Sequence, residues 1–247
     1  MEAVPVHRFM SHAANVRRTD SNVHRTDSNV RRTDGDVATL HHRPIAALAG
    51  VEVLAITRAA VVLGSTQAQD IVNVDRANEQ GFDVVRRRSG GGIVILQPHD
   101  HVWIDVTVPR GHPLWHDDVE RATWWVGEVW CDVLQQVDAT HSWRVHRNKL
   151  AASALERSVC FAAVGPGEVL RSESGSGAGR KVVGISQRRT KDAARFQCTL
   201  FRSIDIALHE SLLAVALPTT LRNACGVGDA LDDVGHRAAI ALATKLG

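Results

Sequence analysis

The sequence has no tyrosine, only four cysteines and no long apolar run. Cys131, Cys160, Cys198 and Cys225 form no CxxC pair, which argues against a disulfide framework and suits a reducing compartment. No run approaches the roughly 18 apolar residues that a transmembrane helix needs, and no secretory signal pattern is present. We therefore expect a cytoplasmic protein without a membrane partner.

The chain also lacks a charge excess. It has 29 Lys+Arg against 27 Asp+Glu, a formal net charge of +2, so no strong field favours a nucleic-acid partner. Hydrophobic residues make up 44% and charged residues 23%, which is an ordinary globular balance. A length of 247 residues fits one large domain, or one domain plus a tail.

Residues 15–35 form a seven-residue repeat that reads NVRRTDS, NVHRTDS, NVRRTDG. Each unit contains one apolar residue (Val16, Val23, Val30), whereas a coiled coil needs two per heptad. Its Asn, Asp, Ser and Thr residues favour turns over helix. We therefore predict a disordered leader over residues 1–40 and a folded domain over 41–247, with a functional binding tail as the alternative for the leader.

Beyond the leader, short runs rich in Val and Ile predict strands, and apolar residues at three- and four-residue steps predict helices. The predicted strands are 51–56, 60–63, 83–88, 93–96, 102–108, 158–164, 167–171, 180–187 and 196–201. The predicted helices are 70–80, 117–137, 204–216 and 229–246. Strands and helices do not alternate regularly, so we predict an α+β fold with a mixed, largely antiparallel sheet flanked by helices.

The most informative stretch is residues 86–92, Arg-Arg-Arg-Ser-Gly-Gly-Gly, between two predicted strands. Three consecutive glycines indicate either a turn with positive φ or a close approach to the backbone. Exposed backbone N–H groups beside guanidinium groups make a site for phosphate or carboxylate. A glycine-rich hairpin with solvated arginines is the alternative.

A second stretch, residues 179–187, reads as a strand with a lysine near its start. Strand alternation predicts that Lys181 shares a face with Val183 and Ile185, at the head of an apolar wall. Gly184 on the other face would let another backbone come close. The alternative is a surface lysine that extends over the sheet.

The combination of RRRSGGGIV, SVCFAAVGPGEV, GRKVVGISQRR and FQCTLF resembles the lipoate–protein ligase and octanoyltransferase superfamily, which shares its catalytic fold with biotin–protein ligase. The resemblance covers residues 61–201 and implies a biotin/lipoate-ligase-like catalytic domain. In that family the arginine–glycine loop binds the acyl chain and the adenylate, and the strand lysine contacts the acyl carbonyl or phosphate. The resemblance implies Lys181 as the catalytic residue. It implies substrate or adenylate binding by Arg87, Ser89, Gly90, Gly91, Gly92 and Gly184.

The sequence departs from the family pattern at three places. Ile95 and Leu96 stand where ligases commonly carry an aromatic residue and a histidine, so that polar contact is missing. Gln197 stands where many relatives have a histidine before Gly-Thr. Only residues 202–247 remain after the last motif, too few for a separate accessory domain beside two helices.

The resemblance implies an ATP- and Mg²⁺-dependent ligase that activates lipoate or octanoate as an acyl-adenylate. Its acceptor would be a lysine in the lipoyl domain of a 2-oxoacid dehydrogenase or of a glycine cleavage protein. The alternative is an octanoyltransferase that takes the acyl group from acyl carrier protein through Cys160, which stands where some relatives keep a nucleophile. The other interpretation of Cys160 is a buried structural cysteine. A third hypothesis for the protein is a non-catalytic relative, or one subunit of a split ligase that an accessory-domain subunit completes.

Histidine-rich turns do not predict a metal centre. His99, His101, His112 and His116 lack the His-Glu-x-x-His spacing, and no cysteine stands at ligand spacing to them. We therefore expect no protein-bound metal.

Overall fold

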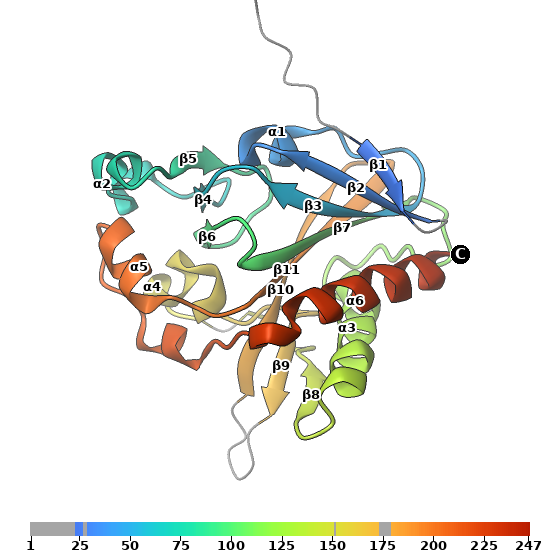
Figure 1. Cartoon of the computed structure of the whole chain (residues 1–247). Helices are drawn as coiled ribbons and strands as arrows, with labels where there is room; N and C mark the ends of the chain where they lie inside the picture. Colours follow the sequence, from blue (N-terminus) through green and yellow to red (C-terminus); the bar gives the residue numbers. More distant parts are fainter. Residues whose placement is uncertain (1–22, 27–28, 151, 173–178) are drawn as a thin grey trace, which may run out of the picture.

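The structure is a computed structural model that describes residues 23–26, 29–150, 152–172 and 179–247. Its centre is an eight-stranded sheet in the order β1-β2-β3-β7-β11-β10-β9-β8 (Figure 1). All neighbouring strands are antiparallel except the parallel pair β2 and β3. In sheet order the strands are Val23–Thr26, Val30–Gly35, Gly50–Ile56, His101–Pro109, Ala193–Phe201, Gly179–Arg189, Val169–Ser172 and Ser142–Val145.

A second sheet has three strands in the order β5-β4-β6. These strands are Asp83–Arg86, Ala60–Leu63 and Val94–Leu96. β4 pairs in parallel with β5 and antiparallel with β6, so residues 87–93 must cross from one side of β4 to the other. This crossing contains the three glycines.

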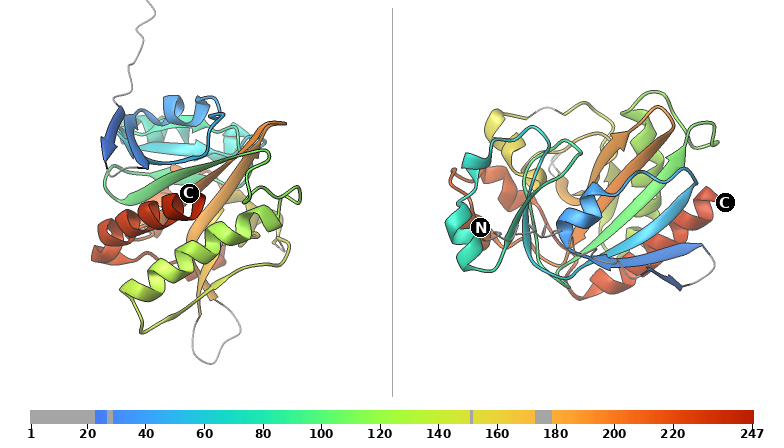
Figure 2. Two further views of the ribbon diagram at one scale, coloured as in Figure 1. Left: turned by 90° about the vertical axis from the view of Figure 1, so that its right-hand side faces the viewer. Right: turned by 90° about the horizontal axis from the view of Figure 1, so that it is seen from above.

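Six α-helices surround the sheets in the described part of the chain. They are α1 Val37–His42, α2 Val74–Glu79, α3 Trp124–Val137, α4 Ala154–Ser158, α5 Ile206–Leu212 and α6 Leu231–Leu246. None of the described helices is long and apolar enough to cross a membrane. α3 and α6 lie side by side on one face of the large sheet (Figure 2).

The large sheet separates two hydrophobic cores. Under α3 and α6, Ile104, Val106 and Phe196 of the sheet pack with Trp130 and Val234 of the helices. The second core lies on the other side. It joins part of the large sheet to the small sheet and to α1, α2 and α5. The predicted α+β fold with a mixed, mostly antiparallel sheet is confirmed.

The predicted disorder of residues 1–40 is wrong for Val23–Thr26, which form β1, and for Val30–Leu40. Six residues of the third repeat form β2, which pairs with β3, and Thr33 is fully buried. Asp36 then caps α1, whose Val37 and Leu40 are 1% and 0% exposed. The turn-forming residues of the third repeat form a strand because pairing with β3 and the buried side of α1 stabilise them. Residues 1–22 and 27–28 of the predicted leader lie outside the described residues.

Several predicted boundaries also differ. The segment 158–164 is not a strand, because a capping box at Ser153 starts α4 and the chain continues as a 3₁₀ turn at Cys160–Ala162. The predicted helix 117–137 is regular only from Trp124. The helix predicted over 70–80 begins after Asn73, whose side chain caps α2.

Candidate functional site

The glycine loop is built around a buried arginine. Arg87 is 6% exposed, and its Nη2 donates to the carbonyl oxygen of Gly92 at 3.0 Å, which closes the loop over the guanidinium. Gly91 has φ +103°, and a Cβ there would lie 2.6 Å from Arg87 Nη2. The positive φ favours glycine here, and any larger residue would displace the Arg87 guanidinium.

The loop is held from both sides by close backbone contacts. A Cβ on Gly64, just after β4, would lie 1.9 Å from the Gly91 oxygen. A Cβ on Gly92 would lie 2.7 Å from the Cys160 nitrogen. Among the described residues, no backbone hydrogen bond engages the N–H groups of Gly90, Gly91 or Gly92. Fixed, unengaged N–H groups beside a guanidinium provide a binding site for an anion.

Lys181 on β10 is 3% exposed and fully hydrogen-bonded. Its Nζ lies 2.7 Å from Oε1 of Glu168 and donates to the carbonyl oxygens of Cys160 at 2.7 Å and Ala163 at 3.0 Å. It also lies 4.9 Å from the centre of the Phe161 ring. All three ammonium protons therefore have acceptors, and one of these acceptors is a counter-charge.

The predicted face of Lys181 is wrong for Val183, although Ile185 lines the same cavity as the lysine. A β-bulge shifts the register between Lys181 and Val183, so that Val183 packs in the core under α3 and α6. Lys181 instead lies on the side of Gly184, where an added Cβ would be 3.6 Å from Lys181 Cε and 3.2 Å from the Phe161 ring. A bulge rotates a strand locally, which strict alternation cannot predict. Gly184 makes room for the lysine and for Phe161, and it does not line the cavity described next.

A cavity of about 650 Å³ connects the glycine loop to the lysine, a volume within the usual range for small-molecule sites. Of the predicted site residues, those that line it are Arg87, Gly90, Gly91, Gly92, Cys160 and Lys181. Its apolar wall includes Ile71, Leu150, Val159 and Ile185. Ser89, which was also predicted, is 2% exposed and lies behind the loop.

Cys160 lies between the two halves of the site. Its backbone N–H donates to the oxygen of Ile93 at 2.9 Å, which ties it to the residue after the glycines. Its thiol is free, and Sγ lies 4.0 Å from Lys181 Nζ. The geometry thus places a thiol beside an ammonium group at the cavity wall.

Two residues of the candidate site, Glu168 and Ser186, were not among those predicted from the sequence. Glu168 pairs with Lys181 and also accepts from the N–H groups of Gly165 at 2.7 Å and Ile185 at 3.2 Å. It stands in the GPGEV segment, where an acidic residue in an otherwise apolar stretch was the available signal. Ser186 lines the cavity as well, from the strand that carries Lys181.

A buried polar network lies behind the glycine loop. Ser89 Oγ donates to Oε1 of Gln197 at 3.1 Å, and Gln197 Nε2 donates to Oδ1 of Asp105 at 3.4 Å. Burial raises the pKa of Asp105 to about 6, although Arg195 lies nearby. Burial, with nearby arginines, lowers the pKa of His41 to about 2, so this imidazole is neutral. Gln197 therefore makes a polar contact to the loop through Ser89.

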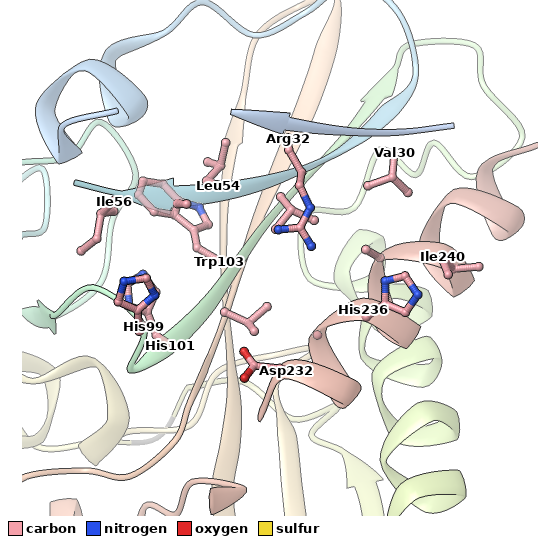
Figure 3. Close-up of a pocket in the computed structure, with 15 residues that line it drawn as sticks. Val30, Arg32, Leu54, Ile56, His99, His101, Trp103, Asp232, His236 and Ile240 are labelled. Atoms are coloured by element: carbon pink, nitrogen blue, oxygen red, sulfur yellow. The ribbon is translucent and has the colours of Figure 1, made fainter. Parts of the chain in front are cut away.

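A smaller cavity of about 190 Å³ is lined by residues of β2, β3, β7 and α6, among them Arg32, His101 and His236 (Figure 3). It contains none of the predicted site residues. Within the described ranges, no group of three or more His, Cys, Asp or Glu side chains could hold a metal ion.

The fold is that of lipoate–protein ligase catalytic domains. It is similar to the Thermoplasma acidophilum protein Ta0514, a putative lipoate protein ligase with bound lipoic acid, at TM-score 0.61 and 16% identity, covering 85% of this chain and 77% of that one. A lipoate–protein ligase A bound with ATP gives TM-score 0.59 and 17% identity over the same shares. The bi-partite lipoate protein ligase of T. acidophilum, studied with its E2 lipoyl domain, gives 0.59 and 15%, covering 85% of this chain and 76% of that one.

The sequence itself identifies the family. Residues 39–234 match the model of the lipoyl protein ligase A/B catalytic domain, and the chain belongs to that family. No curated protein matches the sequence. The predicted membership of the lipoate ligase and octanoyltransferase superfamily is confirmed.

Proposed function

We propose that the protein attaches lipoyl or octanoyl groups to a lysine of a lipoyl domain through an acyl-adenylate. One observation carries this proposal: an anion-binding loop with Arg87 and unengaged glycine N–H groups faces a buried lysine across one cavity. Acyl-adenylate chemistry needs both parts, because it develops charge on a phosphate and beside a carbonyl.

In the first step a carboxylate oxygen of the fatty acid attacks the α-phosphorus of ATP, and pyrophosphate leaves. Arg87 and the amides of Gly90 to Gly92 would hold the phosphate oxygens. Lys181 has no unused donor, so a substrate oxygen must displace one of its acceptors. The longest of these bonds, to the Ala163 oxygen at 3.0 Å, is the one we expect to be replaced.

In the second step the ε-amine of the acceptor lysine attacks the acyl carbonyl, the bond to the phosphate oxygen breaks, and AMP leaves as the amine loses a proton. Magnesium would neutralise the triphosphate.

The solved structures of similar fold support the choice of acceptor and substrates. Relatives of the same fold bind lipoic acid and ATP, and one was studied with its E2 lipoyl domain. We expect the same classes of ligand here, with the lipoyl domain of a 2-oxoacid dehydrogenase or a glycine cleavage protein as acceptor.

Mass spectrometry tests this function. A lipoyl domain incubated with the protein, lipoate and ATP should gain one lipoyl mass, and omission of ATP should prevent the gain. Lys181→Ala should abolish the modification, also in combination with Glu168→Gln, which removes the buried carboxylate otherwise left unpaired, because the lost ammonium acts on developing charge. Lys191→Ala, which removes an exposed lysine outside the cavity, is the matched control. An active Lys181→Ala variant would contradict the assignment of this site.

A second function is favoured by the position of Cys160. Its thiol lines the cavity 4.0 Å from Lys181 Nζ, where a thiolate could attack the thioester of an octanoyl carrier protein. The carrier thiol would leave, and the acceptor lysine would then take the octanoyl group from Cys160. Incubation with octanoyl carrier protein without ATP separates this reaction from the first, since only the transferase gives octanoyl-Cys160 and a modified lipoyl domain. Absence of both reactions would favour a non-catalytic relative or one subunit of a split ligase.

A further inference from the structure

A chain of hydrogen bonds runs from the cavity wall into the interior of the sheet. Ser186, which lines the cavity, donates through Oγ to Ser89 Oγ at 3.3 Å. Ser89 in turn donates to Gln197, and Gln197 donates to Asp105. Ser89, Gln197 and Asp105 are 2%, 5% and 2% exposed, so the chain is closed to water behind Ser186.

The carboxylate at the inner end fixes the direction of every bond in the chain. Oδ1 of Asp105 acts as an acceptor, so the amide nitrogen of Gln197, which lies 3.4 Å from it, must face it. Trp103 Nε1 donates to the same oxygen, Asp105 Oδ1, at 2.7 Å, so this oxygen acts as an acceptor. The amide oxygen of Gln197 therefore faces Ser89, and the hydroxyl proton of Ser89 must point to this oxygen.

The hydrogen-bond direction at Ser89 also fixes the orientation of the Ser186 hydroxyl at the cavity wall. Because the proton of Ser89 already bonds to Gln197, the Ser89 oxygen can only accept a hydrogen bond from Ser186. If Ser186 also pointed its proton elsewhere, lone pairs of the two hydroxyl oxygens would face each other. The proton of Ser186 thus points away from the cavity. Its hydroxyl presents only lone pairs to a ligand, and it needs a hydrogen-bond donor there.

The groups of an acyl-adenylate differ in what they can donate. The aliphatic chain, the acyl carbonyl and the phosphate carry no donor at neutral pH, whereas the nucleoside carries the ribose hydroxyls and the adenine amino group. We propose that Ser186 is a specificity residue that accepts a hydrogen bond from the nucleoside of the adenylate. This inference rests on the proposed ATP-dependent function.

Nucleotide binding in the absence of the acceptor domain tests the inference. The probes are ATP, 2′-deoxyATP, 3′-deoxyATP and the triphosphate of purine riboside, which lacks the amino group. Wild-type protein should bind one of the three analogues about 3- to 10-fold more weakly than ATP, the range for one neutral hydrogen bond. That analogue identifies the donor on the nucleoside.

Ser186→Ala should bind ATP more weakly by the same factor and should no longer distinguish that analogue from ATP. Ser211→Ala, which removes a hydroxyl on α5 outside the cavity, should retain the wild-type pattern. A Ser186→Ala variant with wild-type affinity for ATP, or with the wild-type discrimination, would overturn the inference while the proposed function stands. A wild-type protein that binds no ATP would overturn both.

Discussion

Replacing Glu168 by glutamine should strongly destabilise the protein, because it leaves the Lys181 ammonium buried without a counter-charge. The two side chains are 7% and 3% exposed, and their charged atoms lie 2.7 Å apart. Removal of one partner of such a buried pair costs about 3–5 kcal/mol, since the remaining charge keeps its desolvation cost. The carbonyl acceptors of Cys160 and Ala163 remain, so we expect about 3 kcal/mol for Glu168→Gln.

Urea unfolding at pH 7 measures this change as a shift in the free energy of unfolding. Glu128→Gln is the matched control, because Glu128 forms an ion pair with Arg147 in which both side chains are about half exposed. Exposed pairs contribute about 0–1 kcal/mol, so this control should stay close to wild type. The double variant Glu168→Gln/Lys181→Met should regain part of the lost stability, because it removes the unpaired charge. A Glu168→Gln variant within about 1 kcal/mol of wild type would refute the reasoning.

Three further predictions concern other parts of the chain. A chain shortened to begin at Asn22 should keep the stability of the full chain. One that begins at His41 should lose at least about 4 kcal/mol by urea unfolding, because it lacks β2 and the buried Leu40; equal stability of the two would contradict the fold account. Because the pKa of Asp105 is raised in the folded state, its carboxyl group binds a proton more tightly there than in the unfolded state. The stability of wild type relative to Asp105→Asn should therefore rise by about 2 kcal/mol as the pH falls from 7 to 4, and a pH-independent difference would argue against it. Cys160→Ser should leave ATP-dependent lipoylation within a few-fold of wild type, whereas a loss of orders of magnitude would favour the transferase.

The fold class and the position of the main site residues could be predicted from the sequence. Arg87, the three glycines, Cys160 and Lys181 meet at one cavity, as the motifs imply. Each of these features taken alone was ambiguous, and the assignment came from the resemblance of the combined motifs to the lipoate–protein ligase family.

The errors have local physical causes. The orientation of Lys181 depends on a β-bulge, which depends in turn on how β9 pairs with β10. The strand in the third repeat depends on its partner β3, since the same residues read alone favour turns. Glu168 was missed because it lies just before β9 while its partner Lys181 lies on β10, and no spacing rule along the chain connects the two.

The central claim is that one cavity activates a fatty acid with ATP and passes it to a protein lysine. Intact-mass analysis of a lipoyl domain tests it most directly, in one run with lipoate or octanoate and ATP and in a parallel run with octanoyl carrier protein alone. The account predicts one added acyl group and release of AMP and pyrophosphate in the first run, and an unmodified domain in the second. Modification in the second run alone, with an octanoyl adduct on Cys160, would contradict it.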